Sequence, residues 1–204
     1  MGESCSNLNN QQTSHYPICK TLFDSYPDIA CAFSAVAFRT GTESIEGKRS
    51  PMTFKLRSPE FANGADMPRS LTCDGEDRSP SLEWGEPPSG TKSLALIADD
   101  PDAPAGTWVH WVIFNIPASV RMLPAGFEGK EQLPDGTRQG TNDFRKIGYN
   151  GPCPPPGKPH RYFFKLYALN TGLALPSGAK KRELEQAMAA HILESAEWMG
   201  RYRR

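Results

Sequence analysis

The sequence predicts a mainly β protein in which long strands lie between two layers and an amphipathic helix lies near the C-terminus. Three segments, at residues 93–98, 109–116 and 161–169, are apolar on nearly every position, which is typical of strands covered on both faces. Glycine and proline number 18 and 19 among 204 residues, while aromatic residues remain at 10%. This composition favours many short strands joined by structured turns.

The individual elements follow from the pattern along the chain. Links rich in glycine, proline and aspartate separate five expected strands, at residues 53–56, 81–84, 93–98, 109–116 and 161–169. A helix is expected over residues 179–199, because the apolar and small side chains there fall at helical spacing. These side chains are Leu184, Met188, Ile192, Ser195 and Met199.

The chain divides into two parts. Residues 1–51 begin with a polar stretch and show no sustained period of 2 or 3.6, so we expect an N-terminal extension that is mostly disordered or that precedes the true start codon. Alternation begins at Met52, and residues 52–204 are expected to form the folded domain. A chain of this length suits one domain with an appendage.

Charge and cysteine usage limit the classes of partner and the location. Lys plus Arg and Asp plus Glu are 23 each, so the overall field does not favour nucleic acid or an acidic membrane surface. No apolar stretch is long enough for an integral membrane segment. The five cysteines are odd in number and contain no C-x-x-C pair, and we interpret them as mostly reduced thiols, which favours a cytoplasmic location.

Four side chains are expected to meet at one end of the sheet. Asp100 ends one predicted strand and His110 opens the next, so antiparallel pairing places them together. His160 opens a later strand, and Tyr162 lies two residues further on the same strand face. Two strand starts share one end of a sheet if the strands are parallel or if one antiparallel strand separates them, and a mixed or Greek-key topology provides this.

This set of side chains suits the binding of an anion. Imidazole offers N–H donors and, when protonated, a positive charge, and a neighbouring carboxylate raises the pKa of the ring. Gly151 has no side chain, so its backbone can approach a ligand, and the surrounding prolines stiffen the rim. We expect the proline run that follows Cys153 to be a rigid wall of the pocket rather than a ligand for an SH3 domain.

Simpler interpretations of the same residues stay open. Asp100 and Asp102 suit a tight turn, each histidine suits a structural role, and Cys153 suits either a small, partly buried residue or a reactive thiol. A second functional class is a hydrolase in which Asp100, His110 and His160 form a metal site or an acid–base pair. The third class is a purely structural or oligomeric protein.

Several separated motifs resemble the phosphatidylethanolamine-binding protein family, which includes Raf kinase inhibitor protein. They are "DDPDAP", "WVHW" and "GYNGPCPPPGKPHRYFFKLYAL", and "LTCDGEDRSPSLEW" and "TNDFRKIGYNGPCPPPG" resemble its bacterial and archaeal YbhB/YbcL-type branch. The resemblance covers residues 52–204 and implies a β-sandwich with Greek-key connections, a mixed sheet and a C-terminal α-helix. It departs at Arg145 and Asn150, where that branch usually has glycine.

The resemblance also implies a function. The family's anion pocket is for phosphate or a phosphorylated headgroup, and the family includes inhibitors of kinases or proteases; it implies neither enzymatic activity nor a cofactor. The bacterial branch implies a homodimer. The residues that match the pocket are Asp100, His110, Gly151, Pro152, His160 and Tyr162, with Asp102 and Trp108 at its rim.

Overall fold

The computed structural model describes residues 53–204. The expectations for residues 1–51, including the free thiols of Cys5, Cys19 and Cys31, lie outside the described residues. The part that is described forms its own compact unit.

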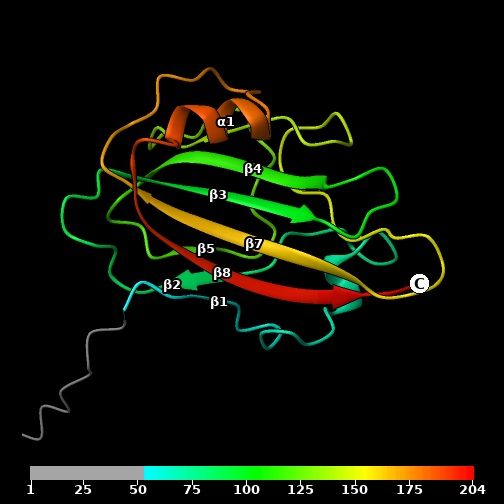
Figure 1. Ribbon diagram of the computed structural model, residues 1–204. Coiled ribbons are helices and arrows are strands. Elements are labelled where there is room, and N and C mark those ends of the chain that lie inside the picture. The colour runs from blue at the N-terminus through cyan, green and yellow to red at the C-terminus, as the bar shows by residue number, and fades with distance from the viewer. Residues whose placement is uncertain (1–52) are drawn as a thin grey trace, which may run out of the picture. The chain divides into compact units, whose positions relative to one another are not determined.

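Two antiparallel sheets form a sandwich, which confirms the predicted mainly β fold (Figure 1). The larger sheet has the strand order β6 (Arg138–Gln139), β4 (Trp108–Pro117), β3 (Ser93–Asp100), β7 (His160–Leu169) and β8 (Ile192–Tyr202). The smaller sheet has the order β1 (Leu56–Arg57), β2 (Leu82–Trp84) and β5 (Met122–Leu123).

The expectation of a mixed sheet is wrong for these strands. Every pair of neighbouring strands is antiparallel, and parallel pairing is confined to isolated bridges such as that between Asp66 and Arg201. Strand β3 separates β4 from β7, so β4 and β7 run in the same direction without pairing with each other. This arrangement brings the first residues of β4 and β7 to the same end of the sheet.

The larger sheet is covered on both faces, as the continuous apolar pattern of its central strands predicts. One face packs against the smaller sheet in a core that includes Trp84, Trp111 and Phe164. The opposite face packs against helix α1 (Lys181–Met188), whose Leu184 and Met188 are buried. All eight residues of β3 are buried, so this strand is the fixed centre on which the site is built.

The predicted C-terminal helix is too long. It covers only Lys181–Met188, and the chain then forms β8, which pairs with β7 from His160 to Leu169. The helical spacing of Leu184 and Met188 is genuine, but its continuation through Met199 is a coincidence. This segment is a strand because it pairs with the otherwise free edge of β7. Alternate residues of β8, such as Ala196 and Trp198, face the core.

The interpretation of the cysteines as mostly reduced is wrong for the two that are described. Cys73 and Cys153 form a disulfide, with 5.4 Å between their Cα atoms and 80 residues between them in sequence. Disulfides are rare in reducing compartments. The predicted cytoplasmic location was inferred from reduced cysteines, so the Cys73–Cys153 disulfide removes that argument for it. In residues 53–204, no helix has the length and apolar character needed to cross a membrane.

Candidate functional site

The end of β3 is fixed by Asp100, a buried residue with 3% exposure. Its Oδ1 accepts a hydrogen bond of 2.8 Å from the backbone N–H of Asp102, which is the side-chain-to-backbone contact that starts a tight turn. Its Oδ2 accepts a second hydrogen bond, also 2.8 Å, from Nδ1 of His160. The carboxylate therefore shapes the loop and orients a histidine at the same time.

His110 reaches the site through a β-bulge. Ala98 pairs with Trp111 and Asp99 pairs with Val109, so His110 is the extra residue of β4 opposite β3. A bulge re-aims a side chain and is frequent next to functional sites. The ring is held by a hydrogen bond of 2.6 Å from its Nδ1 to the Asn150 carbonyl.

Strand β7 supplies His160 at its first position and Tyr162 on the same face. The rings of His110 and Tyr162 lie edge to face, with 5.2 Å between their centroids. The two histidines and the tyrosine, from strands separated by β3, are therefore brought together as the sequence predicts.

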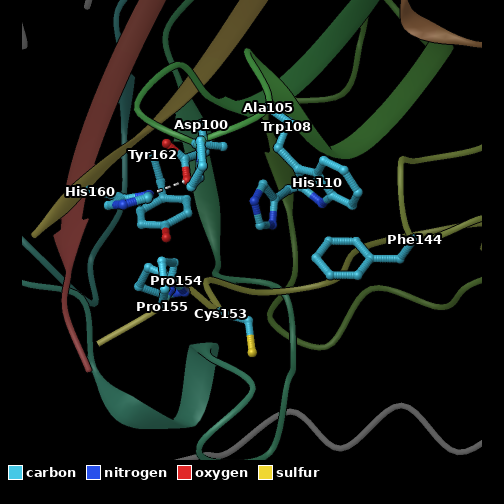
Figure 2. A pocket seen from close by; sticks show the side chains of 12 residues that line it. Asp100, Ala105, Trp108, His110, Phe144, Cys153, Pro154, Pro155, His160 and Tyr162 are labelled. Carbon is cyan, nitrogen blue, oxygen red and sulfur yellow. Dashed lines mark hydrogen bonds and ion pairs between the residues drawn. The ribbon is translucent and has the colours of Figure 1, made fainter. Parts of the chain in front are cut away.

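These side chains line a pocket of about 340 Å³ (Figure 2). Its walls are mostly apolar and come from two loops, one before β4 and one before β7. The lining residues are Asp100, Ala103, Pro104, Ala105, Trp108, His110, Phe144, Cys153, Pro154, Pro155, His160 and Tyr162. A few convergent polar groups within an apolar concavity are typical of small-molecule sites.

Phe144 is a pocket residue that the sequence analysis missed. Its ring packs edge to face against Trp108 at 5.5 Å and against His110 at 5.3 Å. It lies in an irregular loop, where no periodic pattern indicates which way a side chain points. Pro154 and Pro155 do form a wall, which is the role expected for the proline run.

Burial governs the charge of His110. Desolvation lowers the pKa of this ring below its ordinary value of 6.5 and outweighs the opposing effects of the Asn150 carbonyl and the Asp100 carboxylate. Asp100 does favour the charged form of His110, as expected, but burial outweighs its effect, so the expectation of a raised pKa is wrong for this ring. At neutral pH the ring is neutral, with its proton on Nδ1 and with Nε2 as an acceptor.

The Tyr162 hydroxyl is buried and has no hydrogen-bond partner among residues 53–204. Burial, and then the nearby negative charge of Asp100, raise the pKa of Tyr162 well above its ordinary value. A hydrogen-bonding contact with the Asp100 side chain contributes to the same shift, although its geometry is too poor for a formed hydrogen bond. Figure 2 shows the tyrosine ring between His160 and His110, with its hydroxyl directed toward the proline wall.

The two predicted rim residues have different positions. Trp108 lines the pocket, whereas Asp102 is held by Arg161 through contacts of 2.7 and 2.9 Å. This guanidinium lowers the pKa of Asp102 to about 2. Asp102 therefore fixes the loop against the start of β7 and is not among the lining residues.

Gly151 and Pro152 lie behind the pocket wall rather than on its surface. A Cβ at Gly151 would lie 2.2 Å from the Leu71 carbonyl oxygen, so glycine is needed for close packing against the chain near the 3₁₀ helix η1 (Arg69–Leu71). Its N–H donates to Asp77 at 2.6 Å. The Pro152 carbonyl accepts from the N–H of Cys73 at 3.1 Å, so both residues position the wall that follows them.

The loop that carries Phe144 differs from the expected branch pattern in an informative way. Arg145 has a φ of 62°, a left-handed conformation that glycine adopts at lower cost. Asn150, the other departure, donates to Asp77 at 3.1 Å and accepts from Asn142 at 2.9 Å. These contacts fix the carbonyl that holds His110.

The expected metal alternative is not supported by the positions of the side chains. Within residues 53–204, the His, Cys, Asp and Glu side chains form no group of three that could hold a metal ion. Asp100 Oδ2 accepts from His160 Nδ1, and His110 Nδ1 donates to a backbone carbonyl, so these atoms are already engaged in hydrogen bonds.

Comparison with known proteins identifies the family. The model of the family described as "Phosphatidylethanolamine-binding protein" matches residues 57–203. The chain belongs to the phosphatidylethanolamine-binding protein family. It is 50% identical over 149 residues to a UPF0098 protein of Methanothermobacter thermautotrophicus, an alignment that covers 73% of this chain and 98% of the relative. It is 46% identical over 127 residues to the UPF0098 protein YbcL of Escherichia coli, covering 58% of this chain and 69% of that protein.

Solved structures of the phosphatidylethanolamine-binding protein family share the fold. The crystal structure of Escherichia coli YbcL matches with a TM-score of 0.69 and 38% identity, over 74% of this chain and 98% of that one. A homologue from Chlamydia trachomatis matches with a TM-score of 0.68, the same identity and the same coverage. The resemblance to the bacterial and archaeal branch is therefore confirmed.

Proposed function

We propose that this family member is a binding protein whose pocket holds a small anionic group of the phosphate type, either free or as the headgroup of a phosphorylated ligand. The observation that carries the proposal is the Tyr162 hydroxyl, which is buried beside two histidines and has no hydrogen-bond partner in the part of the chain that the structure describes. A buried polar group without a partner has a free-energy cost of about 1–3 kcal/mol. A ligand oxygen at this point would remove that cost.

The two histidines supply complementary contacts to such a ligand. Asp100 accepts a hydrogen bond from Nδ1 of His160 and thereby orients the ring. His110 is neutral at neutral pH because it is buried, so its Nε2 becomes a donor only when it takes up a proton. Binding of a phosphate oxygen there is expected to be coupled to proton uptake and to weaken as the pH rises.

The apolar walls indicate that the ligand extends beyond its charged end. Proline, alanine and aromatic side chains surround the polar groups, and they favour a carbon-containing substituent over a hydrated free ion. The family is named after a lipid whose headgroup is a phosphodiester of ethanolamine. Phosphoethanolamine is therefore a suitable probe, and inorganic phosphate tests whether the organic part contributes.

Calorimetric titration of the full chain tests the proposal. Both probes are titrated from mildly acidic to mildly alkaline pH, in buffers of different ionisation enthalpy so that proton uptake is measured directly. His110→Ala and His160→Ala are expected to weaken binding roughly ten- to a hundred-fold, the loss of one charge-assisted hydrogen bond.

His191→Ala is the matched control, since His191 bonds Asn170 and is not among the pocket residues. It is expected to bind like the wild type. Equal affinity in all four proteins, or the absence of binding to both probes, would contradict the proposal.

An acid–base hydrolase is the second candidate function. The hydrogen bond of 2.8 Å between Asp100 and His160 joins side chains that are only 5% and 11% exposed, and a carboxylate that orients an imidazole is a frequent arrangement in general-base catalysis. Release of p-nitrophenol from its phosphate and acetate esters distinguishes the two functions. Turnover that is lost in His160→Ala would favour the enzyme, whereas binding without turnover would favour the binding protein.

Inhibition of a kinase or protease and assembly as a homodimer are proposals that follow from the family alone. Light scattering at micromolar concentration tests the dimer, and a monomer would overturn it. For inhibition, variants of the pocket should change the potency of the protein against a given target if the target contacts the rim.

A further inference from the structure

The disulfide lies at the mouth of the pocket. Cys73 follows η1, Cys153 lies in the loop before β7, and both residues are exposed. Cys153 is also one of the residues that line the pocket. An exposed disulfide is accessible to thiols, and exposed disulfides are more readily reduced than buried structural ones.

Few hydrogen bonds hold the proline wall within the described residues, although Pro154 is buried. Behind Cys153, Gly151 and Pro152 are fixed by hydrogen bonds to Asp77 and Cys73. Beyond Cys153 the residues at positions 154–156 are prolines, which have no N–H to donate, and the next hydrogen bond is that of 3.3 Å from Gly157 to the Arg204 carbonyl. The disulfide is therefore the covalent cross-link between the start of the wall and the segment after η1.

The two sulfur atoms have different surroundings. The Arg204 guanidinium lies 3.9 Å from Sγ of Cys153 and is itself held by Asp74 at 3.2 Å. A neighbouring cation stabilises a thiolate and makes it a better leaving group. An incoming thiolate is thus favoured to attack Cys73 and to release Cys153.

We propose that the Cys73–Cys153 disulfide is a redox-sensitive clasp that sets the affinity of the pocket for its anionic ligand. This inference rests on the proposed function, whose regulation it describes. In the first step a thiolate forms a bond to Sγ of Cys73, the Cys73–Cys153 bond breaks, and its electron pair leaves on Cys153. A second thiolate then attacks the mixed disulfide and releases Cys73, so that two thiols of the reductant become one disulfide and the protein gains two thiols.

Reduction loosens the wall and thereby weakens binding. Pro154 and Pro155 can still contact the ligand after reduction. The loop that carries them is no longer cross-linked, however, so it must become ordered each time a ligand binds, and this ordering has an entropic cost. We expect the reduced protein to bind phosphoethanolamine about tenfold more weakly than the oxidised protein.

The experiment compares three forms of the full chain. The first is a C5S/C19S/C31S variant, in which Cys73 and Cys153 are the remaining cysteines, so any effect of the reductant comes from this pair. It is measured in the oxidised form and after treatment with millimolar dithiothreitol. The second is the wild type under both conditions. The third is a C73S/C153S variant, whose affinity for phosphoethanolamine is expected to be low and to be the same with and without dithiothreitol.

Two readouts separate this proposal from the proposed function. Calorimetry with phosphoethanolamine reports affinity, and hydrogen exchange of the peptide that contains Gly157 and Lys158 reports order in the loop without any ligand. Faster exchange together with weaker binding after reduction supports the clasp. Equal affinity and equal exchange in the two redox states overturn it, as does a disulfide that dithiothreitol does not reduce in the folded protein.

The remaining outcomes are also decisive. If the oxidised protein does not bind the probe, the proposed function fails and the control of affinity fails with it, whereas the exchange rates still show whether the disulfide orders the loop. If C73S/C153S does not melt cooperatively, the reduced C5S/C19S/C31S protein carries the test, because its own melting curve shows whether it is folded when affinity is measured.

Discussion

Replacing Tyr162 with phenylalanine should stabilise the free protein and weaken ligand binding. The substitution removes one oxygen atom and leaves the ring in place. Because that hydroxyl is buried without a partner, its removal relieves a desolvation cost of about 1–3 kcal/mol. For a domain of this size, each 1 kcal/mol raises the melting temperature by roughly 2–4 °C.

Binding should change in the opposite direction. If the hydroxyl donates to an anionic ligand, its loss removes a charge-assisted hydrogen bond of about 1.5–3 kcal/mol, and affinity falls roughly ten- to a hundred-fold. Melting curves without ligand and calorimetry with phosphoethanolamine measure the two effects on the same protein samples.

Tyr149→Phe is the matched control. The Tyr149 hydroxyl donates to the Leu71 carbonyl at 2.9 Å, so its removal breaks a formed hydrogen bond and should destabilise the protein by about 1 kcal/mol. The reasoning would be refuted if Tyr162→Phe were destabilised as much as the control, since the hydroxyl would then have a partner in the free protein. Unchanged affinity would refute its role in binding.

Three further outcomes are expected. Burial lowers the folded-state pKa of His110 below 6.5, so the unfolded chain binds more protons at this residue than the folded protein does. The stability of the wild type should therefore fall relative to that of His110→Asn as the pH decreases below about 6.5. Chemical unfolding from pH 7.5 downward measures both free energies of unfolding, and parallel pH curves for the two proteins would contradict the prediction. Gly151→Ala should cost about 1–3 kcal/mol, because its Cβ meets a backbone oxygen at 2.2 Å, whereas Gly172→Ala, with its nearest contact at 4.0 Å, should be nearly neutral in the same melts. Residues 52–204 should unfold cooperatively without the extension, and a broad, non-cooperative melt would show that the domain boundary is misplaced.

The strands of the larger sheet could be predicted because their environment leaves a direct trace in the sequence. A strand covered on both faces is apolar throughout, and β3 is buried at every position. Strand β8 gave a weaker signal, because its core-facing positions include Ala196 and Gly200 as well as Trp198. Small residues contribute little to an alternating pattern, so the helical spacing that begins with Leu184 dominated the interpretation.

Contacts between distant segments were the least predictable part. The cysteines of the disulfide are 80 residues apart, and nothing in their spacing indicates that their loops meet. Phe144 was missed for the same reason, since it enters the pocket from a loop. His110 and His160 could be predicted because each lies at or near the start of a strand, and strand order then placed both at one end of the sheet.

Asp100 shows why the turn and the binding site are not competing explanations of the same residue. One oxygen accepts from the Asp102 backbone and the other from His160, so a single carboxylate positions both the loop that lines the pocket and a polar group inside it. Asp100→Asn would disturb the turn and the histidine together, and a loss of affinity in that variant would not separate the two roles. Among the described residues the Tyr162 hydroxyl has no hydrogen bond of good geometry, so its removal leaves the turn and His160 in place, and its effect on affinity reports the ligand contact.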